Sequence, residues 1–354
     1  MSGEGDPRAA AHLRSGHPDI SWSIVLDLAL DLPVDPAEAT RRVRAGWPVE
    51  EMGPPPQVAE GPPAGAADRL EAMADRPYRS GESRCRIEVV TDPSPRLRVA
   101  AHHGYLDGLG TVAAASLALG VPLATTIRGV GPGFGPRPAG RAYVARRFVE
   151  AMLVPPARFV PDRRTGERGD HLLELPRPAI PAGTSDVIAA ATRALVRWNR
   201  SRGRGTSRVV VAVGASRRPG SRPSLAEGSA WFRFRVARPD PAEIRGTLQR
   251  AAPEPGGSAA MTGRAAARMA RALASRTGSS MLVSNLGLVE DAGPIRSGAF
   301  YPAVHGRSGI AVGVVTVNDT LTLTLRARRS EFTRRAAETI LHSIGEELVI
   351  GPAP

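Results

Sequence analysis

Residues 97–119 read LRVAAHHGYLDGLGTVAAASLAL, in which two adjacent histidines are followed by an Asp-Gly pair. The first five residues of this stretch predict a strand, and the residues after the Asp-Gly pair predict a helix. The second histidine, His103, therefore lies at the end of a rigid strand, and Asp107 follows four residues later to organise the turn. An imidazole held in this way suits a general base, because histidine is the side chain whose ordinary pKa lies near neutrality.

The string His102-His103-Gly104-Tyr105-Leu106-Asp107-Gly108 matches the HHxxxDG pattern. The chain resembles the superfamily of chloramphenicol acetyltransferase and the peptide-synthetase condensation domains, which includes wax-ester synthases and alcohol acyltransferases. An isolated pair of histidines would more often be an ordinary, partly buried pair, but the surrounding segments favour the resemblance. In family order they are Arg76-Pro77-Tyr78 before a strand, the helix start Ser185-Asp186-Val187-Ile188, Arg217 after a Val-rich strand, Ser284-Asn285-Leu286-Gly287 and the hairpin at 309–326.

The resemblance implies an α/β fold of the α+β layered kind. Two similar chloramphenicol-acetyltransferase-like subdomains with mixed sheets would form a V around a central tunnel. The alternation of strands and helices in both halves favours α/β layers independently. We expect an N-terminal subdomain carrying HHxxxDG at residues 1–154, a crossover linker rich in Pro, Arg and Gly at 155–183, and a C-terminal subdomain at 184–354.

The hydrophobic patterns predict the individual elements. Strands are expected at 20–30, 84–90, 96–101, 208–215, 229–237, 280–285, 309–317 and 320–327, and helices at 33–45, 107–119, 142–153, 184–199, 241–250, 263–275 and 331–348. Residues 53–66 are expected to form a loop, and Asp35 is the expected N-cap of the first helix. The helix at 142–153 is basic and amphipathic, which suits a membrane or a carrier protein, but such helices more often pack the apolar face inward.

The resemblance also implies roles for the motif residues. His103 would be the general base, while His102 would point the other way and support the turn. Asp107 would be structural and bind either Arg217 or nearby backbone amides; Arg217 alternatively is a solvated loop residue. Gly108 would allow a close approach of the backbone, or a conformation that a side chain would block.

Two further segments carry candidate chemistry. Ser284 and Asn285 would donate hydrogen bonds to the oxyanion or to the thioester arm, or they simply form a turn that leaves a buried strand. Cys85 lies in the middle of a predicted strand, where a packing role is favoured over a nucleophile. No His/Cys group has the spacing of metal ligands, so no metal site is expected.

The composition argues against a nucleic-acid-binding, a secreted or a membrane-spanning protein. The 47 basic residues give a net charge of +13, and all of them are arginines. Because Ala, Gly and Pro are also abundant, this bias is best explained by a GC-rich genome, and no nucleic-acid-binding pattern accompanies it. The single cysteine suits a reducing compartment, and neither a signal peptide nor a transmembrane segment is predicted. We therefore expect a cytoplasmic protein.

The sequence predicts an acyltransferase of secondary or lipid metabolism. It would move an acyl group from acyl-CoA, or from a phosphopantetheine-linked thioester on an acyl carrier protein, to a hydroxyl or amine of a small molecule or lipid. No permanently bound cofactor is expected, and the presence of both halves favours a monomer. The alternative is a non-catalytic condensation-like module that binds an acyl carrier protein or an acyl chain.

Overall fold

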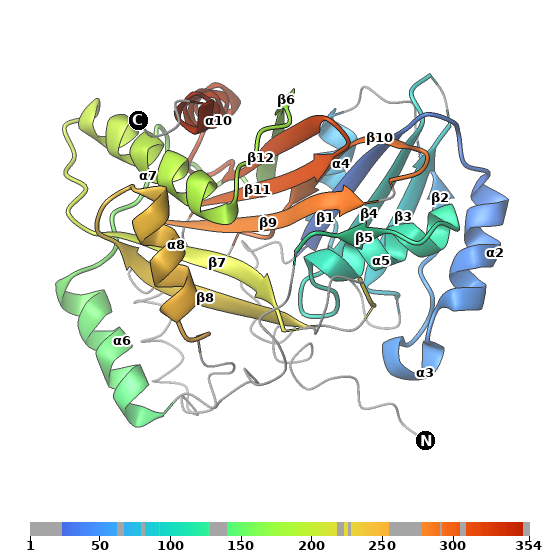
Figure 1. Ribbon diagram of the computed structural model, residues 1–354, viewed down its shortest axis with the longest axis horizontal. Coiled ribbons are helices and arrows are strands. Elements are labelled where there is room, and N and C mark those ends of the chain that lie inside the picture. The colour runs from blue at the N-terminus through green and yellow to red at the C-terminus, as the bar shows by residue number, and fades with distance from the viewer. Residues whose placement is uncertain are drawn as a thin grey trace.

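The strand that leads to the two histidines lies in the middle of a mixed β-sheet, here called sheet A (Figure 1). The computed structural model describes residues 23–61, 67–78, 82–91, 93–127, 140–217, 223–225, 228–254, 278–290, 292–304 and 309–349. Across sheet A the strand order is β10 (Ile295–Tyr301), β1 (Ser23–Leu30), β4 (Arg96–His102), β3 (Cys85–Val90) and β2 (Val58–Glu60). Neighbours are antiparallel except β2 and β3, which are parallel.

A second mixed sheet, here called sheet B, belongs mainly to the C-terminal half. Its order is β6 (Asp170–Pro178), β12 (Thr320–Arg328), β11 (Ile310–Val317), β9 (Met281–Glu290), β7 (Val209–Ser216) and β8 (Ser229–Val236), with β5 (Ala124–Thr125) pairing with β9. Strand β9 runs parallel to both β7 and β11, whereas the other pairs are antiparallel. Both sheets are open, and both are mixed, as the sequence analysis expects.

Helices cover the two sheets in separate groups (Figure 1). On sheet A, α5 (Gly108–Leu119) and α2 (Pro36–Gly46) pack on one face, α4 (Ala67–Asp75) contacts β1 and β6, and the short α3 (Val49–Met52) follows α2. On sheet B the covering helices are α7 (Thr184–Arg200), α8 (Pro241–Arg250) and α10 (Arg334–Val349). Asp35 caps α2 as predicted, because its side chain accepts a hydrogen bond from Ala37 N at 3.0 Å.

Alternation along β4 determines which side chains face which helices. Leu97, Val99 and Ala101 join the buried cluster beneath α2 and α5, while Ala100 joins a cluster with α4 on the opposite face. Because His102 follows Ala101, the histidine pair lies where β4 leaves the sheet and the chain turns toward α5. The strand and the helix are both buried, so the turn between them has a rigid support.

The two sheets meet where β10 crosses β11. Strand β10 comes from the C-terminal half but pairs with β1 of the N-terminal half. A Cβ atom on Gly313 would overlap the carbonyl oxygen of Phe300, so the two backbones are in direct contact. Glycine is required here because of this close approach.

Several elements differ from the sequence-based expectations. Strand β6 lies inside the expected linker 155–183, β2 lies inside the expected loop 53–66, and α3, α4, β5 and β10 were not predicted. The prolines of β6 made this segment look like a linker in the sequence. They are tolerated in the structure because β6 is an edge strand, paired only with β12 within sheet B. The helix expected at 263–275 lies outside the described residues. The domain boundaries at 154 and 183 remain a prediction, since β5 and β10 cross between the halves.

Helix α6 (Arg141–Leu153) confirms the expected amphipathic helix but reverses its expected orientation. The side chains of Phe148, Val149, Met152 and Leu153 are exposed instead of buried. Among the described residues, no helix is long and apolar enough to cross a membrane.

Candidate functional site

The turn between β4 and α5 is held by hydrogen bonds at both of its ends. At the first end, the N–H of His102 donates to Arg84 O at 2.9 Å, and the carbonyl of His102 accepts from Tyr105 N at 2.8 Å and Leu106 N at 3.1 Å. At the other end, the carboxylate of Asp107 accepts from Gly110 N at 2.8 Å and caps α5. The turn that carries the imidazole of His103 is therefore hydrogen-bonded at both of its ends.

The half-buried ring of His103 contacts the backbone of its own turn. Its Nδ1 lies 3.4 Å from the carbonyl oxygen of Leu106. A carbonyl oxygen can only accept a hydrogen bond, so this contact favours the tautomer with the proton on Nδ1. Such a tautomer leaves the lone pair on Nε2, which is the atom that would have to accept a proton from a substrate.

His102 lies deeper and contacts different groups. It is buried, its Nδ1 accepts a hydrogen bond from Gly104 N at 3.2 Å, and its ring meets the Tyr78 ring edge-on at a centroid distance of 5.7 Å. The hydroxyl of Tyr78 accepts from Ser23 Oγ at 3.3 Å, and burial raises the pKa of Tyr78 to about 12. His102 thus packs the turn against the un-ionised side chain of Tyr78.

Asp107 and Arg217 both bind the backbone of the same short segment, residues 228–229 at the start of β8. The second carboxylate oxygen of Asp107 accepts from Gly228 N at 3.1 Å. Arg217 N donates to Gly228 O at 2.6 Å, and its Nε donates to Ser229 O at 2.8 Å. Backbone amides were one of the two expected partners of Asp107. The motif aspartate and Arg217 therefore both hold the segment 228–229, and Arg217 is not simply a solvated loop residue.

Gly108 packs closely against two neighbouring side chains. A Cβ atom on this residue would lie 2.7 Å from Leu286 Cδ2 and 3.1 Å from Phe300 Cζ. Its backbone is not among the glycines with positive φ in the described ranges, so a left-handed conformation is not the reason for glycine. The first turn of α5 lies directly against Leu286, the residue after Ser284 and Asn285.

Ser284 and Asn285 lie inside β9, which continues to Glu290, and not at the turn that the sequence predicts. The side chain of Asn285 accepts from Gly287 N at 2.7 Å and donates to Thr184 Oγ1 at 3.3 Å. The register between β9 and β11 shifts here, and Gly287 has a φ of +72°. These features define a bulge, which is a common device for re-aiming side chains near active sites.

The partners of these residues had no direct signal in the sequence. Gly228, which binds Asp107, is separated from it by 121 positions, and Thr184, which binds Asn285, is separated by 101 positions. Gly228 lies outside every quoted motif, and Thr184 is marked only as the start of an expected helix. Tyr78 was weakly indicated by the sequence, because a Pro-Tyr pair precedes the strand here as it does in the family that the chain resembles.

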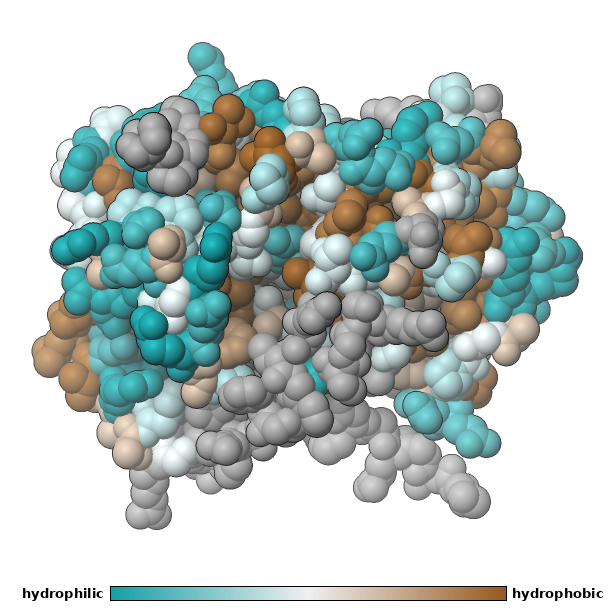
Figure 2. All heavy atoms as spheres, viewed as in Figure 1, coloured by the Kyte–Doolittle hydropathy of each residue, from teal (hydrophilic) through white to brown (hydrophobic). Residues whose placement is uncertain are grey.

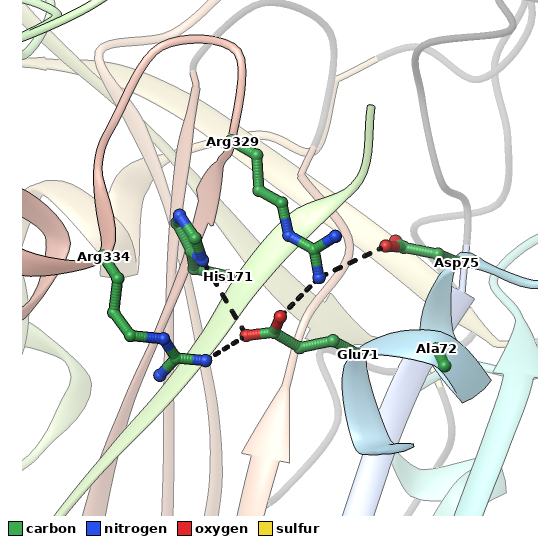
Figure 3. Close-up of a pocket in the computed structure, with 6 residues that line it drawn as sticks. All are labelled: Glu71, Ala72, Asp75, His171, Arg329 and Arg334. Carbon is green, nitrogen blue, oxygen red and sulfur yellow. Dashed lines mark hydrogen bonds and ion pairs between the residues drawn. The ribbon is translucent and has the colours of Figure 1, made fainter. Parts of the chain in front are cut away.

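A separate charged cavity of about 290 Å³ lies between α4, β6 and the segment that joins β12 to α10 (Figure 3). The carboxylate of Glu71 makes most of the contacts among the lining residues. It binds Arg329 and lies 2.7 Å from Arg334 Nη2. It also accepts a hydrogen bond from Leu172 N at 3.0 Å. Burial raises the pKa of Glu71, but His171, the Leu172 amide and Arg329 together lower it from 4.5 to about 2. Glu71 is therefore ionised throughout the neutral range.

Neither the cysteine nor the metal-ligating residue types form a reactive site in the described part of the chain. Cys85 is fully buried, and burial raises the pKa of its thiol to about 12, so it is protonated at neutral pH. Within the part of the chain that the structure describes, no group of three or more His, Cys, Asp or Glu residues could hold a metal ion.

No protein-family model matches the sequence, and no curated protein matches it. The fold, in contrast, matches solved structures over almost its whole length. The first condensation domain of the calcium-dependent antibiotic synthetase, in complex with a substrate analogue, matches with a TM-score of 0.64 and 15% identity, over 99% of this chain and 96% of that chain.

Two other domains show the same likeness. The starter condensation domain of rhizomide synthetase, in complex with C8-CoA, matches with a TM-score of 0.60 and 14% identity, over 97% of this chain and 93% of that one. The epimerization domain from the third module of tyrocidine synthetase B matches with a TM-score of 0.50 and 11% identity, over 96% and 94%. This chain therefore has the two-subdomain fold of the condensation domains, as expected from its HHxxxDG motif.

Proposed function

We propose that this protein is an acyltransferase that moves an acyl group from a CoA or carrier-protein thioester to a hydroxyl or amine, with His103 as the general base. The observation that carries the proposal is the contact of His103 Nδ1 with Leu106 O, which leaves Nε2 as the basic atom. The fold adds support, since a domain with this fold has been solved in complex with C8-CoA.

The reaction follows from ordinary acyl-transfer chemistry. Nε2 of His103 accepts the proton of the acceptor O–H or N–H while that oxygen or nitrogen attacks the thioester carbonyl carbon. The C–S bond then breaks, and the proton on Nε2 passes to the departing thiolate. An ester or amide and a free thiol are the products, and no covalent acyl-enzyme is required.

The remaining motif residues support this site in the proposal. Asp107 and Arg217 hold the segment 228–229 against the turn, and Gly108 allows α5 to pack beside Leu286. Ser284 is our first candidate for stabilising the oxyanion, because two polar atoms of Asn285 already bind Gly287 and Thr184. No bound cofactor is needed beyond the thioester substrate.

The proposal extends to setting and assembly. Because Asp107 and Gly228 come from the two halves of one chain, we infer a site completed within a monomer. The acceptor would be a small metabolite or lipid, within secondary or lipid metabolism, and an acyl carrier protein is the proposed partner if CoA is not the donor. We place the protein in the cytoplasm on its single cysteine, which suits a reducing compartment.

The test is thiol release, followed with a chromogenic thiol reagent, from a panel of acyl-CoAs in the presence of pooled alcohols and amines. We expect release that depends on the acceptor and falls by about 10²–10⁴-fold in His103→Ala. His342→Ala removes an exposed imidazole on α10 and serves as the matched control, with unchanged activity.

The same panel, presented on a loaded carrier protein, follows if no acyl-CoA reacts. Release from the carrier that requires His103 supports the proposal and identifies the donor. The non-catalytic module would behave differently: the wild type and His103→Ala would bind the loaded carrier equally well, and neither would release thiol from either donor.

A further inference from the structure

Helix α6 presents its apolar side to solvent. Five exposed apolar positions near its C-terminal end, here called the α6 ridge, are Phe148 at 44%, Val149 at 53%, Met152 at 44%, Leu153 at 74% and Val154 at 51% exposure. Figure 2 shows hydrophobic residues at the corresponding edge of the molecule, where Figure 1 places α6. Large apolar side chains gathered in this way on a surface mark an interaction site.

The inner side of α6 is held by polar contacts, which is the reverse of an ordinary surface helix. Glu150 forms ion pairs with two residues outside the helix, Arg208 at 2.5 Å and Arg233 at 2.9 Å, and also with Arg147 of α6 itself at 2.7 Å. The hydroxyl of Tyr143 binds the carboxylate of Glu254. These contacts fix the rotation of the helix, so the ridge is outward because the fold holds it there.

A basic loop lies beside the C-terminal end of the ridge. Ala157 N donates to Arg208 O at 2.7 Å, and Asn199 Nδ2 donates to Arg158 O at 2.7 Å, so the segment after α6 runs alongside the connection from α7 to β7. That connection carries exposed arginines, which are Arg200, Arg202 and Arg204. The connection that carries these positive charges therefore lies against residues 157 and 158, three and four positions beyond the end of the ridge.

We propose that the α6 ridge and the adjacent arginine loop dock the protein on an anionic lipid surface. A convex ridge of aliphatic and aromatic side chains can enter a lipid layer without a matching groove, and nearby guanidiniums bind the anionic headgroups. A second copy of this chain fits less well, because both copies carry a net charge of +13 and each would bring its own arginine loop to the contact. The surface does not include His103 and is independent of the proposed acyl transfer.

The experiment is co-sedimentation of the full chain with vesicles of phosphatidylcholine alone or phosphatidylcholine mixed with phosphatidylglycerol. We expect binding to the anionic vesicles, weakened by salt, and far less binding to the neutral ones. Leu153→Glu and Phe148→Glu should each lower the partition by about tenfold or more. Leu32→Glu changes another leucine with 70% exposure, away from α6, and should bind as the wild type does.

A second pair of variants tests the charges. Arg200→Glu combined with Arg204→Glu should weaken binding to anionic vesicles, whereas Arg44→Glu, on the exposed side of α2, should change it little. His103→Ala should bind vesicles like the wild type, which keeps this result separate from catalysis. Two results would overturn the proposal: equal binding by Leu153→Glu and wild type, or a concentration-dependent dimer that Leu153→Glu abolishes.

Discussion

Asp107 uses both carboxylate oxygens on backbone N–H groups, one at the start of α5 and the other at the start of β8. His103 contributes a single contact of 3.4 Å to the turn. A cap and a buried hydrogen bond both stabilise the folded state, so Asp107 has a structural role, whereas the proposed base His103 contributes little to holding the turn.

Asp107→Ala should lower the free energy of unfolding by about 2–4 kcal/mol, because the helix loses its cap and Gly228 N loses its acceptor. His103→Ala should change it by less than about 1 kcal/mol. Urea denaturation of both variants checks this division. Equal losses of stability would contradict it, and Asp107→Asn, which keeps one acceptor oxygen, should fall between Asp107→Ala and wild type.

Asp75 is a residue whose ionisation opposes folding. Burial, and then the negative charge of Asp170, raise its pKa from 3.8 to about 6, against the lowering influence of Arg326 and Arg329. The folded protein therefore binds this proton more tightly than the unfolded chain does. Ionised Asp75 destabilises the fold above about pH 6, and that destabilisation disappears below about pH 4.

Asp75→Asn should accordingly stabilise the protein at pH 7 and have little effect at pH 4. The difference between the two pKa values corresponds to about 3 kcal/mol as an upper bound. Denaturant titrations at several pH values between 4 and 7 measure it, with Asp31→Asn as an exposed control. A stability difference that does not grow across this range would refute the assignment.

At the scale of elements, α5 packs mainly on α2, β4 and β1, and its first turn also contacts β9. The first turn of the helix lies against Leu286, and β9 bulges at Asn285–Gly287 beside this contact. The helix ends at Leu119, as the sequence predicts, and Gly120 follows in the left-handed conformation with φ +71°. The contact between Gly108 and Leu286 connects the HHxxxDG turn to the Ser-Asn segment.

Gly108→Ala should destabilise the protein by about 1–3 kcal/mol, because the new methyl group would overlap Leu286. Adding Leu286→Val should return part of that loss. Gly205→Ala is the control, since nothing lies within 4 Å of a Cβ atom at that position. Thermal unfolding of the single and double variants gives the comparison, and additive losses would argue against this contact.

At the scale of the whole molecule, Arg326 connects the two sheets. Its side chain is completely buried, its Nε donates to Asp170 Oδ2 at 2.7 Å within sheet B, and its Nη1 binds Ser23 O at the start of β1 in sheet A. The crossing of β10 over β11 supplies the backbone contact between the sheets. A buried charge at this junction is stabilising only as long as its partner remains.

Arg326→Met should cost about 3–5 kcal/mol, because Asp170 would be left buried without its partner. The double variant Arg326→Met, Asp170→Asn should be more stable than Arg326→Met alone. Arg41→Met removes an exposed ion pair with Glu38 and should change stability by less than about 1 kcal/mol. If Arg326→Met behaved like Arg41→Met in denaturant, the junction would not depend on this arginine.

Local sequence determined the parts of this protein whose causes are local. The HHxxxDG turn, the Asp35 cap and the strands around Val99 and Val211 follow from neighbouring residues, through periodicity, capping and β-propensity. Only the tertiary structure decided which distant segments meet. Asp107 reaches Gly228 over 121 positions, and β10 leaves its own half to pair with β1. The outward ridge of α6 belongs to the same class, since periodicity shows that a helix has two faces but not which neighbour will hold one of them.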